Sequence, residues 1–547
     1  MNINELPPEL LVNIFQYLGQ EALLFSVSHI CRHWYHVTKS VSLWHYVDMN
    51  RLVIKRKKRE LNVIQRISEF SLNIQHLKIS PILLVELDSF WKGHGEQLKN
   101  LRKLELIPSR ITSADIFQLV RRTCPNLKTL KFKFSSDQTS ILQSAFHDLN
   151  VEEICLDHEI CGREQHWSLE EKLSTTLYEL EQEISRTKRL TIRSSSYAFI
   201  SFILEKALPL VTCLNAFGVV LSNSDTLNIT SVTATMLTEL HLDFARVSDR
   251  VLIRIAESSP NLKILSLLSC KSITDRGVSM ATKSCHKLER LLLRNSMTSE
   301  VTYGDQSLPS ISLFAVSDDC VSLRMLLAQN LKRFDDVKLS NIIRSCRLLT
   351  SLSLCTCPLL SDSSLEVIAQ NCSMLKSADF SQCPEITFNG VWKIMSGCID
   401  ILSLSLVACD GLVSVVSSIQ IRENETETTI VSVQNTDQLH SVDADLPHSK
   451  IHTLNMAYCC NLDPTSLKMI SEKCKDLRTL ILRFGGNKME NINSDILQAV
   501  FSNCTYLQAI LVGFNDTIDR EETGKKIDKD GHYPSWRLGM GLYHDNA

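Results

Sequence analysis

Apolar residues recur along most of the chain in a pattern whose common step is 26 residues. Segments such as "CRLLTSLSL" and "CSMLKSADF" share one template: a cysteine, an aliphatic residue three positions later, and then alternating polar and apolar positions. We take the last apolar position of the template as the marker of each unit. The markers are Ile79, Leu106, Phe132, Leu156, Ile192, Ala216, Leu242, Leu267, Leu293, Ala328, Leu354, Phe380, Leu406, Met456, Leu482 and Val512.

Each unit predicts a short strand followed by a helix. The alternation L-x-x-L-x-L is typical of a strand with one buried face. A helical pattern follows, as in "SDSSLEVIAQNC", where Leu365, Ile368 and Ala369 share one helical face. One such β–α unit cannot bury its own apolar face, but stacked units can. The sequence therefore predicts an α/β solenoid with one continuous core.

Most of the 19 cysteines occupy two fixed places in this pattern. Eight stand three residues before the first aliphatic position of the strand: Cys124, Cys285, Cys320, Cys346, Cys372, Cys398, Cys474 and Cys504. Five stand three residues after the marker: Cys270, Cys357, Cys383, Cys409 and Cys459. Both places suit a small, buried, weakly donating side chain. No second close pair follows Cys355 and Cys357 at the spacing of zinc ligands, so we expect no metal and no cofactor.

The pattern resembles the cysteine-containing class of leucine-rich repeats, from about residue 70 to 515. This resemblance implies a curved β/α horseshoe whose strands form a concave, protein-binding wall. Wall residues that we expect to contact a protein substrate are Ser266, Arg290, Arg294, Ser353, Asp379, Ser405, Asn455 and Arg483. Three intervals between markers exceed the common step, after Leu156, Leu293 and Leu406, and predict loops. The third contains a polar insertion near 421–450, with a possible short strand in it.

The first 49 residues do not follow the repeat. Pro8 suits the first turn of a helix, and apolar residues follow at helical spacing before Gly19 ends the element. Two further short helices are predicted, the last from "CRHWYHV". Some 45 residues cannot build a large core of their own, which favours an external partner.

This N-terminal stretch resembles an F-box. The residues that match the family pattern are Leu6, Pro7, Glu9, Leu10, Ile14, Phe15, Leu18, Val27, Cys31, Arg32, Trp34, Leu43 and Trp44. The resemblance implies docking on a Skp-type adaptor, which in turn holds cullin and RING subunits. We expect the adaptor to contact Leu6, Pro7, Leu10, Ile14, Phe15, Leu18, Trp34 and Trp44. Ile14, Val27 and Trp34 are also candidates for packing the helices together. His29, His33 and His36 are expected to be solvated.

Composition narrows the range of partners. A net charge of −3 gives no global attraction to nucleic acid or to anionic lipid. There is no run of apolar residues long enough to span a membrane and no secretory signal, so we expect the cytoplasm, the nucleus or both. The basic cluster at 55–59 is either a solvated linker or a nuclear import signal. Nucleic-acid binding is less favoured, because aromatic residues do not accompany it.

These features together predict four segments: an F-box at 1–49, a basic linker at 50–70, about 16 leucine-rich repeats at 71–515, and a tail at 516–547. The tail either folds back and caps the last repeat or contacts a substrate. The sequence contains no Gly-rich phosphate loop, no G-x-S-x-G motif and no H-E-x-x-H motif. We therefore expect a non-catalytic substrate-recognition subunit of an SCF-type ubiquitin ligase, which promotes ubiquitination and proteasomal degradation of a target. The alternative is a leucine-rich repeat scaffold or inhibitor that acts by protein binding outside a ligase.

Overall fold

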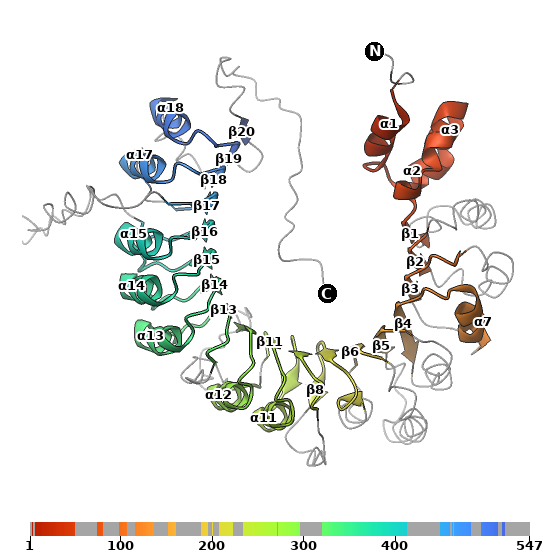
Figure 1. The fold of residues 1–547 in the computed structure, drawn as a ribbon, viewed down its shortest axis with the longest axis horizontal. Helices are drawn as coiled ribbons and strands as arrows, with labels where there is room; N and C mark the ends of the chain where they lie inside the picture. Colours follow the sequence, from red (N-terminus) through yellow and green to blue (C-terminus); the bar gives the residue numbers. More distant parts are fainter. Residues whose placement is uncertain are drawn as a thin grey trace, which may run out of the picture. The chain divides into compact units, whose positions relative to one another are not determined.

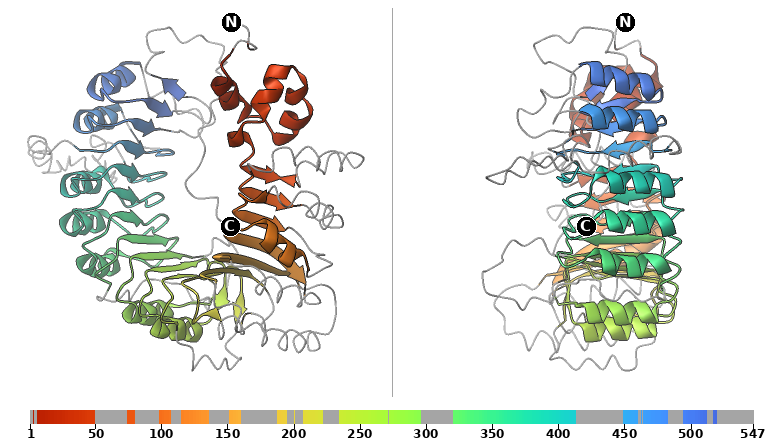
Figure 2. Two further views of the ribbon diagram at one scale, coloured as in Figure 1. Left: turned by 45° about the vertical axis from the view of Figure 1, so that its right-hand side comes forward. Right: turned by 90° about the vertical axis from the view of Figure 1, so that its left-hand side faces the viewer.

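The computed structural model divides into two compact units, Met1–Ile273 and Thr274–Ala547 (Figures 1 and 2). The residues that it describes are 3, 6–49, 74–79, 98–106, 115–135, 151–159, 187–194, 200, 207–221, 234–270, 272–295, 320–412, 449–459, 462, 464–482, 494–511 and 517–519. The basic cluster at 55–59 and nearly all of the polar insertion lie outside these ranges. No helix in the described ranges is both long and apolar enough to cross a membrane.

The first unit begins with three short α-helices, as the sequence predicts. They are α1 (Pro8–Phe15), α2 (Gln20–Phe25) and α3 (Arg32–Thr38), with 3-10 turns at Val27–His29 and Val41–Leu43. Pro8 occupies the first turn of α1, where a missing N–H costs nothing. The expectation that Gly19 ends this helix is wrong: α1 ends at Phe15, and Gly19 has extended backbone (φ −65°, ψ 146°) as the residue that begins α2.

The helices pack around aromatic rings. The rings of Phe15 and Trp34 meet edge to face with centroids 5.1 Å apart. Trp44 is fully buried, and its Nε1 donates a hydrogen bond to the carbonyl oxygen of Thr38 at the end of α3. These contacts tie α1, α3 and the following 3-10 turn into one small core.

The strands of the first unit form a parallel sheet in chain order. They are β1 (Tyr46–Asp48), β2 (His76–Ile79), β3 (Lys103–Leu106), β4 (Thr129–Ser135), β5 (Glu153–Glu159), β6 (Arg189–Arg193), β7 (Cys213–Ala216), β9 (Glu239–His241) and β11 (Ile264–Leu268). Two further short strands, β8 (Val220–Leu221) and β10 (Arg246–Val247), pair with each other. The helices α7 (Asp115–Thr123) and α11 (Asp249–Ser258) lie on one side of this sheet (Figure 1). Because β1 pairs with β2, the sheet starts inside the segment predicted as the F-box.

The second unit repeats the same arrangement more regularly. Its parallel strands are β12 (Arg290–Arg294), β13 (Met325–Gln329), β14 (Ser351–Ser353), β15 (Ser377–Asp379), β16 (Ser403–Ser405), β17 (Thr453–Asn455), β18 (Thr479–Ile481) and β19 (Ala509–Leu511). Its helices are α12 (Asp275–Ser284), α13 (Asp336–Ser345), α14 (Asp362–Asn371), α15 (Phe388–Gly397), α17 (Pro464–Lys473) and α18 (Ser494–Asn503). In Figure 2 they stack as one layer beside the strands. A short strand from the predicted tail, β20 (Thr517–Asp519), pairs antiparallel with β19.

The predicted fold class, an α/β solenoid of the horseshoe type after N-terminal helices, is confirmed. Every repeat marker in the described ranges, from Ile79 to Leu482, has at most 2% of its surface exposed. The register follows the repeat: Leu352, Ala378 and Leu404 pair in sequence across β14, β15 and β16. The core of each unit therefore consists of the apolar positions that define the repeat.

The 13 cysteines at fixed places in the repeat are all buried. The five that follow the markers donate their S–H groups to the marker carbonyl of the preceding repeat, at 2.9–3.3 Å. Just before each of these cysteines lies a residue with left-handed backbone, such as Gln382 at φ 59°. The thiol is small enough to fit beneath this turn and still reaches an acceptor. Cysteine at this place therefore links one repeat to the next.

Candidate protein-binding surfaces

A stripe of exposed apolar side chains runs along α1 and the turn that follows it. Leu10, Ile14 and Leu18 keep 49%, 40% and 38% of their surface, and Tyr17 keeps 87%. Spacings of four, seven and eight residues place them on one helical face. Pro7, which precedes the helix, is exposed as well. We call Pro7, Leu10, Ile14, Tyr17 and Leu18 the α1 stripe.

The structure separates the predicted adaptor contacts into two groups. Pro7, Leu10, Ile14 and Leu18 are exposed, and Leu6 is half-buried. Phe15 and Trp44, by contrast, keep 1% or less of their surface. Their assignment as surface contacts is corrected: the angle between successive helical residues turns Phe15 inward, and the hydrogen bond to Thr38 holds Trp44 in the core.

Trp34 and Ile14, which the sequence suggests equally for adaptor contact and for internal packing, differ in position. Ile14 was a candidate for internal packing, but it lies on the outer face of α1. Trp34 is half-buried against Phe15, and its Nε1 is enclosed with no hydrogen-bond partner among the described residues. Tyr17, which the sequence analysis did not single out, completes the stripe. Helical spacing from Leu10 could have identified it.

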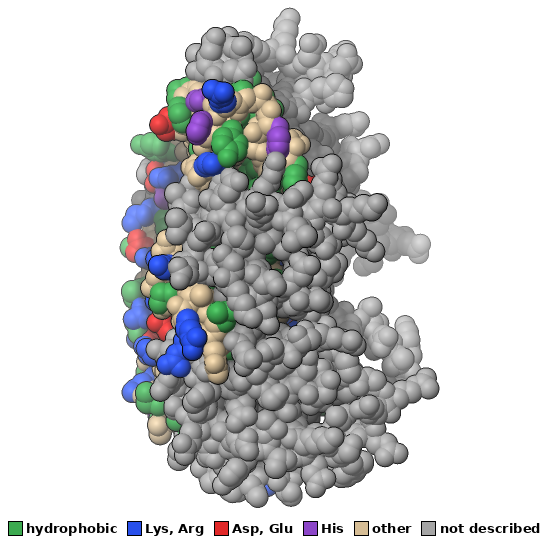
Figure 3. All heavy atoms as spheres, turned by 90° about the vertical axis from the view of Figure 1, so that its right-hand side faces the viewer, with side chains coloured by type: hydrophobic (Ala, Val, Ile, Leu, Met, Phe, Trp, Pro, Cys, Tyr) green, Lys and Arg blue, Asp and Glu red, His purple; other side chains and the backbone are tan. Residues whose placement is uncertain are grey.

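The third helix adds basic and histidine side chains to this region. Helix α3 contains Arg32, His33 and His36 and no acidic residue, and Lys39 follows it directly. Arg32 and His36 are exposed. Figure 3 shows basic, histidine and hydrophobic side chains close together over the N-terminal helices near the top of the view. A partner that covers this region therefore meets apolar and cationic groups together.

The strands of the second unit present a wall of small polar side chains on the face opposite the helices. The residues that alternate with the buried positions of β14 to β17 are Ser351, Ser353, Ser377, Asp379, Ser403, Ser405, Thr453 and Asn455. All of them are half-buried. We call this set the serine wall. It offers hydroxyl, carboxylate and amide groups at regularly spaced positions.

A chain of hydrogen bonds crosses the serine wall. Gln329 Nε2 donates to Ser353 Oγ at 2.9 Å, and Ser353 Oγ donates to Asp379 Oδ2 at 3.4 Å. The other carboxylate oxygen of Asp379 accepts from the backbone N–H of Ser381 at 3.0 Å. Ser381 Oγ lies 2.9 Å from Ser405 Oγ. Asp379 is thus the acceptor at the centre of a row that spans four strands.

The residues predicted to contact a substrate lie in different places, and one of them is buried. Ser353, Asp379, Ser405 and Asn455 lie together on the serine wall. Arg290 is exposed and Arg294 half-buried, both on β12. The expectation that Ser266 contacts a substrate is wrong. Ser266 keeps 1% of its surface and its hydroxyl donates a hydrogen bond to Asp243 Oδ1 at 2.6 Å, so the hydroxyl is not accessible. Arg483 lies outside the described residues.

The strand wall of the first unit is charged instead. Asp48, Lys78, Glu105 and Lys131 follow one another in register across β1 to β4, so acidic and basic residues alternate. Lys78 Nζ lies 3.5 Å from Asp48 Oδ2. Neighbouring strands therefore neutralise one another along this row.

Glu105 is the most strongly held charge of that row. Its Oε1 lies 2.9 Å from His76 Nε2 and 3.1 Å from Lys103 Nζ, and its Oε2 lies 3.9 Å from Lys131 Nζ. The hydrogen bond from His76, helped by the two lysines, lowers the pKa of Glu105 to about 2 against the opposing effect of burial. The carboxylate is therefore ionised throughout the physiological range.

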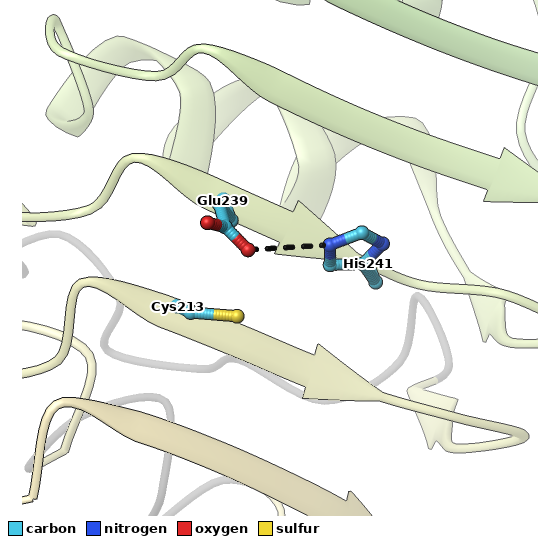
Figure 4. Close-up of side chains that lie close together, drawn as sticks. All are labelled: Cys213, Glu239 and His241. Atoms are coloured by element: carbon cyan, nitrogen blue, oxygen red, sulfur yellow. Dashed lines mark ion pairs between the residues drawn. The ribbon is translucent and has the colours of Figure 1, made fainter. Parts of the chain in front are cut away.

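A further cluster on this wall brings together Cys213 of β7 with Glu239 and His241 of β9 (Figure 4). Their ligand atoms all lie within 4.8 Å of one another. The spacing of zinc ligands along the sequence does not reveal this cluster, because its residues come from different repeats. The sequence does contain one indication of the cluster: Cys213 and Glu239 are separated by one repeat step, and residues so separated pair in register.

The thiols of the described repeats are not activated. Burial raises the pKa of Cys357, Cys398 and Cys409 to about 12. Because the thiolate is the nucleophile, a thiol with a raised pKa is unreactive at neutral pH. These cysteines serve the packing of the repeats.

Comparisons with known proteins agree with the motifs. A family model described as F-box-like matches residues 3–50. "Putative F-box/LRR-repeat protein 22" of Arabidopsis thaliana is 27% identical over a region that covers 24% of this chain and 50% of that protein. The chain thus spans half the length of this curated relative.

Two solved structures overlap most of the chain at low similarity. One chain of the Rad7 and Elc1 complex of yeast is 14% identical with a TM-score of 0.40, covering 82% of this chain and 96% of that one. A leucine-rich repeat protein of Leptospira interrogans is 12% identical with a TM-score of 0.35, covering 82% and 97%. At these TM-scores the two likenesses add nothing to the repeats seen directly.

Proposed function

We propose that this chain, a member of the F-box/leucine-rich repeat family, is the substrate-recognition subunit of an SCF-type ubiquitin ligase. The observation that carries the proposal is the α1 stripe, which lies inside the region matched by the F-box-like model. In this role the N-terminal helices bind a Skp-type adaptor, and the strand wall binds a target protein. The adaptor links the chain to cullin and RING subunits.

The energetics of the α1 stripe support an adaptor contact. Full burial of a Leu or Ile side chain is worth about 1.5–3 kcal/mol. Leu10, Ile14 and Leu18 have already buried more than half of their surface, so covering the rest contributes about 1 kcal/mol each. An amphipathic helix that lays such a stripe into an apolar groove is a recurrent mode of protein recognition. Arg32 and Lys39 on the neighbouring helix favour an acidic rim around that groove.

The serine wall supports a separate site for the target. Its side chains are short, so they need little ordering when a partner binds, and their hydroxyl groups both donate and accept hydrogen bonds. Asp379 adds one negative charge at the centre of the wall. A target with an extended polar segment and a basic side chain fits this surface better than an apolar ligand does.

Catalysis in this proposal comes from proximity. A target held on the wall meets a ubiquitin thioester on a neighbouring subunit at high effective concentration. The chain itself supplies no reacting group and acts as a receptor. Its target is then ubiquitinated and degraded by the proteasome.

The test is co-purification from cells with two charge-introducing variants. The first is Leu10→Asp with Ile14→Asp, which places two carboxylates in the α1 stripe. The matched control is Leu359→Asp, which introduces a carboxylate at a leucine of the second unit with 51% of its surface exposed. We expect wild type and control to recover adaptor and cullin, and the double variant to lose both.

The same experiment separates the proposal from the alternative of a scaffold or inhibitor. Recovery of adaptor without cullin by the wild-type chain contradicts the ligase and favours the alternative. So does an unchanged half-life of every co-purified protein when the chain is depleted. Equal recovery of adaptor by wild type and double variant contradicts docking through α1.

A further inference from the structure

Three side chains on two adjacent strands of the first unit form a compact group of metal-ligand types, and a fourth, Asn215, shares their face of the sheet. In the register of β7 and β9, Cys213 is opposite Glu239 and Asn215 is opposite His241. Residues two apart on a strand share one face, so all four occupy the same face of the sheet. The Sγ of Cys213, the carboxylate of Glu239 and a ring nitrogen of His241 lie within 4.8 Å of one another, and Figure 4 shows the three side chains gathered together.

Asn215 provides an independent observation at the same place. Its Oδ1 atom is enclosed and has no hydrogen-bond partner among the described residues. An enclosed acceptor without a partner costs free energy unless something binds it. Asn215 pairs with His241 across the two strands. A metal ion bound beside His241 could therefore accept an electron pair from Asn215 Oδ1, either directly or through a bound water.

The surroundings of Glu239 also suit a ligand role. Arg189 of β6 donates to both of its carboxylate oxygens, at 3.0 and 3.2 Å. A carboxylate held by a second group is fixed in orientation, which is the usual arrangement behind a metal ligand. Each carboxylate oxygen has a further lone pair, and the His241 Nε2 atom lies 3.9 Å from Glu239 Oε2. Such a separation is close to the ligand-to-ligand distance of a tetrahedral site with metal–ligand bonds of about 2.0–2.3 Å.

We propose that Cys213, Glu239 and His241 bind a divalent transition metal of the zinc class, with Asn215 Oδ1 or a water molecule at the fourth position. A thiolate, an imidazole and a carboxylate form a mixed donor set that suits zinc and disfavours magnesium and calcium, which prefer oxygen ligands alone. The thiolate and the carboxylate together neutralise the dication. The positive charge of Arg189 is offset by Glu153, whose negative charge acts on it.

Binding requires the thiol to lose its proton. Burial raises the pKa of Cys213 to about 12, so the metal displaces this proton at neutral pH. Burial lowers the pKa of His241, so the imidazole is neutral and has a lone pair to offer. One proton is released for each metal bound.

The experiment uses the purified full-length chain and Co²⁺ as a spectroscopic substitute for Zn²⁺. We expect one equivalent of Co²⁺ to produce a sulfur-to-cobalt charge-transfer band, and one equivalent of Zn²⁺ to abolish it. Cys213→Ser should remove the band, and His241→Ala should weaken Co²⁺ binding at least tenfold. The matched control is Cys155→Ser, which alters a half-buried cysteine on the strand wall at β5.

Thermal unfolding with and without Zn²⁺ gives a second readout that does not depend on cobalt spectroscopy. Zn²⁺ should raise the unfolding temperature of wild type and of Cys155→Ser, but not that of Cys213→Ser. The proposal is overturned if no charge-transfer band forms, if the band survives in Cys213→Ser, or if Cys155→Ser removes it. A variant that unfolds without metal at the same temperature as wild type shows that its loss of binding is not a loss of folding.

Discussion

The N-terminal helices and the repeats use regularly spaced apolar residues in opposite ways. In the described parts of the repeats the spaced positions are buried, and the exposed apolar residues there, such as Val337 and Leu359, do not form a helical stripe of this kind. In α1 one helical face points inward through Leu11 and Phe15 while a second apolar face remains open. Isolated exposed apolar residues are ordinary, but several on one face indicate a surface that another molecule covers. The buried apolar positions of the repeats therefore stabilise the fold, whereas the open apolar face of α1 supports the proposed docking on an adaptor.

The largest effect on stability within α1 is expected at its buried face. Phe15→Ala removes a ring that packs against Trp34, and we expect a cost of about 3–5 kcal/mol to the local stability of the helices. Leu10→Ala lies on the exposed face and should cost less than about 1 kcal/mol. Hydrogen-exchange protection of residues 8–38 measures both. Equal losses of protection would show that the two faces are not distinct.

The charged wall of the first unit offers a test of whether its groups are satisfied internally. The pKa of Glu105 is lowered from 4.5 to about 2 in the folded protein. A lowered folded pKa gives stability that is complete above about pH 4.5 and is lost as the pH falls toward 2. We expect a contribution of about 2 kcal/mol, since solvent partly screens the two lysines.

Stability measured by urea unfolding from pH 6 to pH 2.5 checks this contribution. Glu105→Gln should flatten the loss of stability in that window. Glu152→Gln is the control, because its ion pair with Lys128 at 3.5 Å is largely exposed on both sides. If the two variants follow the same pH profile, Glu105 is not held by its neighbours.

The buried cysteines that follow the repeat markers predict a smaller effect on the stability of the second unit. Cys383 is fully buried and donates to the carbonyl of Leu354 at 3.3 Å, so Cys383→Ala should cost about 1–2 kcal/mol. Cys355→Ala, at a half-buried cysteine near the serine wall, should cost less than about 0.5 kcal/mol. Urea unfolding of the two variants compares them. A larger cost at Cys355 would remove the reason given for cysteine beneath the turn.

Much of the fold follows from the sequence because the repeat is a local rule. A marker such as Leu354 or Phe380 has the same neighbours in every unit, so periodicity alone predicts its burial. The end of α1 was missed because Gly19 can either end one helix or begin the next, and its backbone angles decide this. Ser266 was missed for a related reason: its position on the strand is correct, but Asp243 covers it.

The binding surfaces were predictable in kind and less so in detail. Helical spacing identified the apolar residues of α1, but the neighbouring positions Ile14 and Phe15 lie about 100° apart around the helix, and one is exposed while the other is buried. Which of them points inward depends on where Trp34 packs, and a single sequence does not state this. Residues one repeat step apart, such as Cys213 and Glu239, could have been paired from the sequence, because parallel repeats place them side by side.

Titration of the purified full-length chain with a purified Skp-type adaptor tests the central claim most directly. The chain variants are wild type, Leu10→Asp with Ile14→Asp, and Leu359→Asp, with hydrogen-exchange protection of residues 8–38 confirming that the helices of each remain folded. We predict that the double variant binds at least about 100-fold more weakly than wild type, because two desolvated carboxylates oppose burial of the stripe. Leu359→Asp should bind within about threefold of wild type. Undiminished affinity of a folded double variant would contradict the assignment of α1 as the docking surface.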